Sequence, residues 1–138
     1  MAIDYGIKRT GIAVTDPMKM IAYGLQTVAT HQIFDILKDY FLKESVSEIV
    51  VGYPRKLNNQ PSESVKYINP FVKKLERMYP GKKIVLMDER FTSKIAFQSM
   101  IEAGLKKKQR QNKELVDQIS AALILQGYLE SRKINEQN

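Results

Sequence analysis

The sequence predicts one α/β domain on a mixed sheet, in which an antiparallel three-strand meander is followed by two parallel strands and helices cover the sheet. Two observations predict this class. Short apolar, β-prone segments separated by turn residues occupy the start of the chain, and helical periodicity alternates with short apolar runs in the remainder. The 138 residues show no internal repeat and no linker rich in proline or glycine. We therefore expect residues 1–138 to form a single domain.

The meander is predicted from three strands near the N-terminus. They span Met1–Tyr5, Thr10–Thr15 and about Met20–Thr30. The turn Gly6–Arg9 separates the first two strands, and Asp16-Pro17 precedes the third. Connections this short favour antiparallel pairing.

Helices and single strands alternate after the meander. A helix is predicted from apolar residues at helical spacing (Ile33, Leu37, Tyr40 and Phe41), and Thr30 is placed to cap it. Two continuous apolar runs, Glu48–Tyr53 and Lys83–Asp88, are typical of strands buried on both faces. Between them, after a loop over 54–61, lies a second helix with an apolar face (Val65, Ile68, Val72 and Leu75). Pro70 is expected to kink or break it.

Two helices complete the predicted order. One begins near Thr92 and ends at Gly104, and the last covers Glu114–Ser131. Right-handed crossovers place the first strand near the middle of the sheet, between the meander and the parallel strands.

Composition limits the function classes. The chain has no cysteine, which excludes disulfides and thiolate metal sites, and no apolar run approaches the length of a membrane span. No secretory signal is visible, so we expect a cytoplasmic protein without membrane attachment. The formal charge is +7, and residues 70–138 hold fourteen basic against eight acidic residues. This asymmetry suits a nucleic acid partner, although a solvated basic loop has the same signature.

Asp4 is the first candidate functional residue, because a carboxylate in a central apolar strand is unfavourable unless it is paired or binds a cation. Gly6 and Gly11 flank the following turn and leave room for a backbone, a phosphate or an ion to approach closely. The structural alternative is an aspartate that accepts hydrogen bonds from turn amides.

Two further acidic positions are also candidate functional residues. Asp88-Glu89-Arg90 ends a predicted strand, where sites in α/β sheets gather, although a surface ion pair is the simpler explanation. Asp117 lies on the inward stripe of the last helix, although an interaction with the helix dipole is an alternative there. Three converging carboxylates would suit Mg²⁺ or Mn²⁺, two of which can clamp a phosphodiester. His31, at the start of a predicted helix, is predicted to be a surface residue and not a ligand.

Four ordered motifs resemble the YqgF (RuvX) family of bacterial RNase H-like proteins. They are Asp4–Ala13, Gly52-Tyr53-Pro54, Asp88–Ser93 with Ala96, and Val116–Ala122 continued by 124–129. The family's proteins are described as Holliday junction resolvases and as nucleases that mature the precursor of small-subunit ribosomal RNA. The resemblance covers nearly the whole chain. It departs in the loop 55–60, which lacks a common glycine, and at Pro70.

The resemblance implies an RNase H-like fold and a metal-dependent nuclease. It places the catalytic and metal-binding acids at Asp4, Glu89 and Asp117, and so decides between Glu89 and Asp88. Mg²⁺ or Mn²⁺, in a pair of ions, is the implied cofactor. Nucleic acid contacts are expected from residues around the site and in a basic loop: Lys8, Arg9, Arg90, Lys106, Lys107, Lys108 and Arg110.

Several alternatives remain open at this point. The substrate is either precursor ribosomal RNA or a branched DNA junction, and the protein is a monomer or a homodimer. A non-catalytic nucleic-acid-binding module would keep the same fold. A phosphotransferase of the actin and sugar-kinase type also has a D-x-G turn after its first strand, but it needs two such lobes around ATP.

Overall fold

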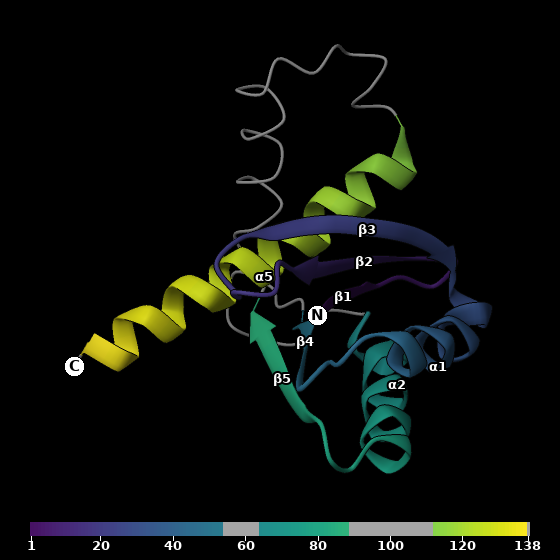
Figure 1. Cartoon of the computed structure of the whole chain (residues 1–138). Coiled ribbons are helices and arrows are strands. Elements are labelled where there is room, and N and C mark those ends of the chain that lie inside the picture. The colour runs from purple at the N-terminus through teal and green to yellow at the C-terminus, as the bar shows by residue number, and fades with distance from the viewer. Residues whose placement is uncertain (54–63, 89–111, 138) are drawn as a thin grey trace.

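A five-stranded mixed sheet forms the centre of the computed structural model, which describes residues 1–53, 64–88 and 112–137 (Figure 1). The strands are β1 (Ala2–Tyr5), β2 (Arg9–Thr15), β3 (Ala22–Ala29), β4 (Glu48–Tyr53) and β5 (Lys83–Asp88). Their order is β3-β2-β1-β4-β5. The first three pair antiparallel, and β4 is parallel to both β1 and β5. The predicted meander and the central position of the first strand are confirmed.

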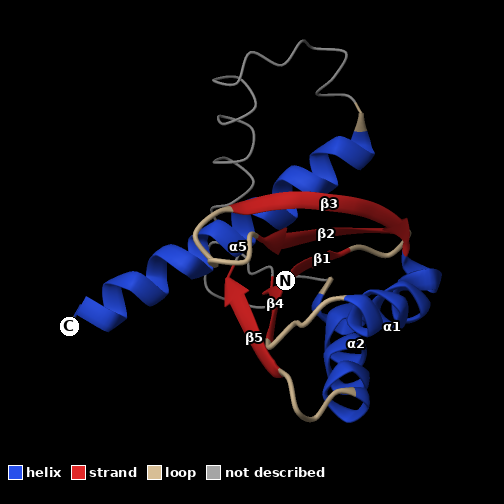
Figure 2. Cartoon of the chain, viewed as in Figure 1, coloured by secondary structure: helices blue, strands red, loops and turns tan. Residues whose placement is uncertain are grey.

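Helices cover both faces of this sheet (Figure 2). A 3₁₀ turn, η1 (Thr30–Gln32), leads into α1 (Ile33–Lys43), which shares one face with α2 (Val65–Met78). The long helix α5 (Lys113–Gln137) crosses the other face. Among the described residues, no helix combines the length and apolar character that a membrane span requires.

Strand alternation divides the core into two layers. On β1, Ile3 packs toward α1 and α2, whereas Ala2 packs toward α5. On β2, Ile12 and Ala13 divide in the same way. The layer under α5 is therefore built from small residues on the sheet. This lets the helix lie close to β1 and β2 and brings its side chains near the strand backbones.

Three local predictions were wrong. The hydroxyl of Thr30 does not cap α1. It donates to the Gly6 carbonyl at 2.7 Å and lies 2.8 Å from the Thr10 hydroxyl, so it ties η1 to the β1–β2 turn. Of the expected kink or break at Pro70, the break is wrong, because α2 continues through this residue and its ring removes only the hydrogen bond to the Lys66 carbonyl. The segment Lys83–Asp88 is an edge strand and is not buried on both faces, with Leu86 47% exposed.

Substitution of Gly11 is predicted to lower the stability of the protein. A Cβ placed there would overlap the backbone of Asp117, with 2.6 Å to its carbonyl carbon, so α5 would have to shift. Gly11→Ala should lower the free energy of unfolding by about 1–3 kcal/mol in urea titrations. Gly81→Ala is the matched control, because a Cβ at Gly81 meets nothing within 4 Å. Equal stability of the two variants would contradict the close contact.

Candidate active site at the C-terminal end of β1

The N-terminal end of α5 is fixed on the sheet by two polar contacts. The Asn112 side-chain oxygen accepts hydrogen bonds from the backbone amides of Glu114 and Leu115, at 3.1 and 3.3 Å, and so caps the helix. The Thr27 hydroxyl on β3 donates to the Glu114 carbonyl at 2.6 Å. These contacts set where the helix begins and which residues of its first turns face the sheet. Asp117 is among them.

Gly11 determines how closely Asp117 approaches the sheet. It is the cross-strand partner of Asp4 in the β1–β2 register, and the backbone of α5 at Asp117 passes directly over it. The sequence predicted that a backbone, a phosphate or an ion would use the space above this glycine. Within the described residues, the group that uses it is the α5 backbone. The result is that Asp4 and Asp117 become neighbours although they are far apart in the chain.

Asp4 lies in an electrostatically unfavourable position. Burial raises the pKa of its carboxyl to about 6, and the negative charge of Asp117 contributes in the same direction. No described residue donates a hydrogen bond to Asp4 in the recorded contacts, so the structural explanation of turn amides bonded to this carboxylate is not supported. A half-buried carboxylate that no described residue pairs is a typical feature of a functional site.

Arg9 compensates the second carboxylate. Its Nε donates to Oδ2 of Asp117 at 2.8 Å, and the two side chains are 40% and 22% exposed. Arg9 and Gly11 lie two residues apart on β2 and so share the face toward α5. Lys8 is exposed in the preceding turn, and its carbonyl accepts the Thr30 amide at 3.0 Å. Arg9 is therefore the basic residue that contacts the acid pair among the described residues, and Lys8 precedes it in the chain on the exposed turn.

Asp88 lies on the other face of the sheet. Val85 and Met87 pack against the layer under α5, whereas Ile84 packs against the layer under α1 and α2. Alternation along β5 gives Asp88 the same face as Ile84 and separates it from Asp4 and Asp117. Asp88 is therefore not a member of the acid pair.

The other predicted site residues lie outside the described residues. These are Glu89, Arg90, Lys106, Lys107, Lys108 and Arg110. Their predicted roles stay predictions. In residues 1–53, 64–88 and 112–137, no group of three potential metal ligands is found, so the structure supplies two acids of the predicted triad. His31 is exposed in η1, as predicted for a surface residue.

The acid pair fits a hard divalent cation. Two adjacent carboxylates offer only oxygen donors, as Mg²⁺ and Mn²⁺ prefer. The pKa of Asp4 is raised first by burial and then by the charge of Asp117, so its ionised form is unfavourable there, and a bound cation would relieve this. Asp4 and Asp117 are the described residues that would hold such an ion.

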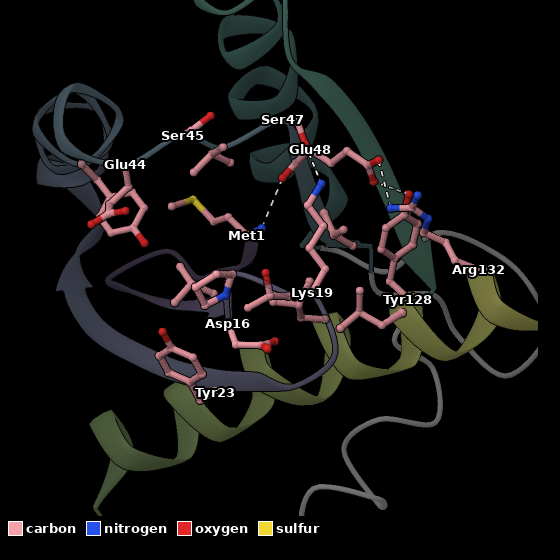
Figure 3. Close-up of a pocket in the computed structure, with 18 residues that line it drawn as sticks. Met1, Asp16, Lys19, Tyr23, Glu44, Ser45, Ser47, Glu48, Tyr128 and Arg132 are labelled. Carbon is pink, nitrogen blue, oxygen red and sulfur yellow. Dashed lines mark hydrogen bonds and ion pairs between the residues drawn. The ribbon is translucent and has the colours of Figure 1, made fainter.

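A cavity of about 640 Å³ lies at the opposite ends of the strands, where β1 and β4 begin (Figure 3). Two of its charged residues, Glu48 and Arg132, form an ion pair. The Glu48 carboxylate accepts hydrogen bonds from the Tyr128 hydroxyl at 2.6 Å and from Arg132 at 3.1 Å. The Tyr128 hydrogen bond lowers the pKa of Glu48, and the charge of Arg132 adds to this effect. We interpret this cluster as the contact that ties the C-terminal half of α5 to β4.

The sequence did not reveal this cluster or the Arg9–Asp117 pair. Glu48 precedes an apolar run and resembles an ordinary strand-end residue, and 80 or more positions separate it from Tyr128 and Arg132. The small residues Ser120, Ala121 and Ala122 signalled that α5 packs closely on the sheet, and Ala121 is fully buried there.

The sheet order, the helices on both faces and the acid pair at the end of β1 define an RNase H-like α/β domain. Residues 1–131 match the model of the RuvX family, described as Holliday junction resolvase. The chain belongs to this family.

Curated relatives agree over nearly their full length. A protein of Flavobacterium johnsoniae is 56% identical over 133 residues, which cover 96% of both chains. One from Bacteroides fragilis is 54% identical over 134 residues and 97% of both chains, and one from Porphyromonas gingivalis is 51% identical over 131 residues and 95% of both. All three carry the name "Putative pre-16S rRNA nuclease".

Asp4→Asn should stabilise the protein at alkaline pH when divalent ions are removed by a chelator. The folded pKa of Asp4, about 6, lies above its ordinary value of 3.8, so the native state holds the proton more tightly than the unfolded state. The stabilising contribution of the neutral carboxyl is complete below pH 3.8 and is lost as pH rises through 6. The variant should therefore gain up to about 3 kcal/mol at pH 8 and almost nothing at pH 3.5, measured by urea unfolding.

Asp39→Asn is the control for this prediction, because Asp39 is exposed on α1. It should change stability little at either pH. An Asp4→Asn variant that is no more stable than the wild type at pH 8 would contradict the electrostatic account of the site.

Proposed function

We propose that this protein is a metal-dependent endonuclease that hydrolyses phosphodiester bonds in structured nucleic acid. The observation that carries the proposal is the juxtaposition of Asp4 and Asp117, with the basic Arg9 paired to Asp117. Membership of the RuvX family and the names of the relatives support the same activity. The arrangement suits a phosphate that is held by cations on one side and faces carboxylates on the other.

The proposed roles follow from the chemistry of each side chain. Asp4 and Asp117 supply carboxylate oxygens to Mg²⁺ or Mn²⁺, with Glu89 as the third acid. A pair of such ions would activate the attacking water and stabilise the leaving oxygen. Lys8, Arg9 and Arg90 hold the phosphate near the acids. The basic stretch with Lys106, Lys107, Lys108 and Arg110 binds backbone farther from the cut.

Precursor 16S ribosomal RNA is the substrate that we favour, because the relatives at 51–56% identity are named for it. A cytoplasmic location goes with that substrate. The family description names a second candidate, the four-way DNA junction. Symmetric cutting of a junction requires two related active sites and hence a homodimer, whereas a processing nuclease can act as a monomer. A cleavage assay with both substrates, combined with light scattering for the oligomeric state, distinguishes them.

Loss of either carboxylate should abolish cleavage with little effect on binding. Asp4→Asn and Asp117→Asn each remove a cation ligand, so the rate with Mg²⁺ or Mn²⁺ should fall at least about a hundredfold. Affinity for the uncleaved nucleic acid, measured by filter binding without divalent ions, should stay within a few-fold of the wild type. Asp88→Asn is the matched control on the opposite face of the sheet and should cleave at the wild-type rate.

Two results would count against the proposed roles. Wild-type rates in Asp4→Asn would remove that residue from the mechanism. If the wild-type protein binds both substrates and cleaves neither with any divalent ion, the protein is instead a non-catalytic nucleic-acid-binding module.

A further inference from the structure

The Arg9–Asp117 ion pair lies at the solvent-exposed side of the acid pair. Arg9 Nε lies 2.8 Å from Oδ2 of Asp117, and the contact links β2 to α5 across 108 positions of the chain. The two side chains come from elements that Gly11 holds close together. A carboxylate of the acid pair therefore already has a positively charged partner.

The remainder of the Arg9 side chain is available to another group. A guanidinium carries five N–H groups, and the Asp117 contact uses the one on Nε. Among the described residues, no hydrogen bond to the two terminal nitrogens is recorded, and the side chain is 40% exposed. The terminal nitrogens form the fork that matches two oxygens of a phosphate. Arg9 can therefore face Asp117 and a phosphate at the same time, or exchange one for the other.

We propose that Arg9 couples cation binding to nucleic acid binding. This inference rests on the proposed function, since it takes Asp4 and Asp117 as the cation site. The guanidinium and a divalent cation compete for the Asp117 carboxylate, so Arg9 weakens cation binding in the free protein. A nucleic acid phosphate that neutralises Arg9 removes this competition. Cations then bind most tightly when nucleic acid is in place.

Electrostatics explains why Arg9 weakens cation binding and why bound nucleic acid strengthens it. A positive charge in contact with a ligand oxygen opposes a divalent cation on the same carboxylate, and a phosphate bound to Arg9 cancels that charge. The pair is partly exposed and therefore weak enough to exchange. By linkage, a cation must raise the affinity for nucleic acid by the same factor by which nucleic acid raises the affinity for the cation.

Arg9→Met tests the competition in the protein alone. It removes the charge and keeps an unbranched side chain, so Mn²⁺ measured by calorimetry should bind about tenfold more tightly than to the wild type. Arg9→Lys keeps the charge and should stay near the wild-type affinity. Lys38→Met is the matched control, because it removes one positive charge from an exposed position on α1. It should leave Mn²⁺ affinity unchanged.

The coupling is measured with a 2′-O-methyl RNA hairpin, which binds without being cut. Fluorescence anisotropy gives its affinity with and without Mn²⁺. Mn²⁺ should raise the wild-type affinity by roughly fivefold or more, and this ratio should fall in Arg9→Met. The same measurements on Lys38→Met should reproduce the wild-type ratio.

The outcomes separate this inference from the proposed function. Unchanged or weaker Mn²⁺ binding by Arg9→Met, or a full coupling ratio in that variant, overturns the role of Arg9 and leaves the nuclease intact. Mn²⁺ binding that is absent from the wild type, or equal in wild type and Asp4→Asn, overturns the cation site and the coupling together.

Discussion

The close contact of α5 with β2 at Gly11 is the constraint on which the site depends. Asp4 pairs with Gly11 of β2, and the preceding residues of β1 are paired on both sides, so the strand fixes the position of its backbone. Only the position of the helix decides whether Asp117 reaches it. The Asn112 cap and the Thr27 contact fix the start of that helix, and the Glu48 cluster fixes its C-terminal half. The missing Cβ at Gly11 then sets the depth of the contact.

The acid pair serves the proposed function but lowers the stability of the fold around it. The fold brings two carboxylates together, gives Asp117 an arginine, and leaves Asp4 partly buried with a raised pKa. A sequence selected for stability alone would not retain an ionised group there, because burial disfavours its charge. Apolar layers pack on both faces of the sheet, around residues such as Ile3 and Ile124. Their burial offsets the destabilising effect of the acid pair.

Much of the fold follows from local patterns, and the failures have physical causes. Continuous apolar runs located Glu48–Tyr53 and Lys83–Asp88 with the bounds that the structure has. They did not show that β5 is an edge strand, because sheet order depends on long-range pairing. Thr30 fits a helix cap locally, but its hydroxyl instead contacts Gly6 in the β1–β2 turn and Thr10 on β2. For the site, an acid in an apolar strand marked Asp4, and helical periodicity marked Asp117. Their juxtaposition and the Arg9 contact depend on packing between distant segments, which no local pattern contains.

The central claim is that Asp4 and Asp117 form one cation site. Anomalous diffraction from crystals grown with Mn²⁺ tests it most directly, because it locates the ion without relying on activity. If the two acids form one site, an anomalous peak should lie about 2.0–2.4 Å from a carboxylate oxygen of Asp4 and from one of Asp117, with Arg9 moved off the shared oxygen. Mn²⁺ bound only elsewhere on the protein, with the Arg9–Asp117 pair intact and no peak beside Asp4, would contradict it.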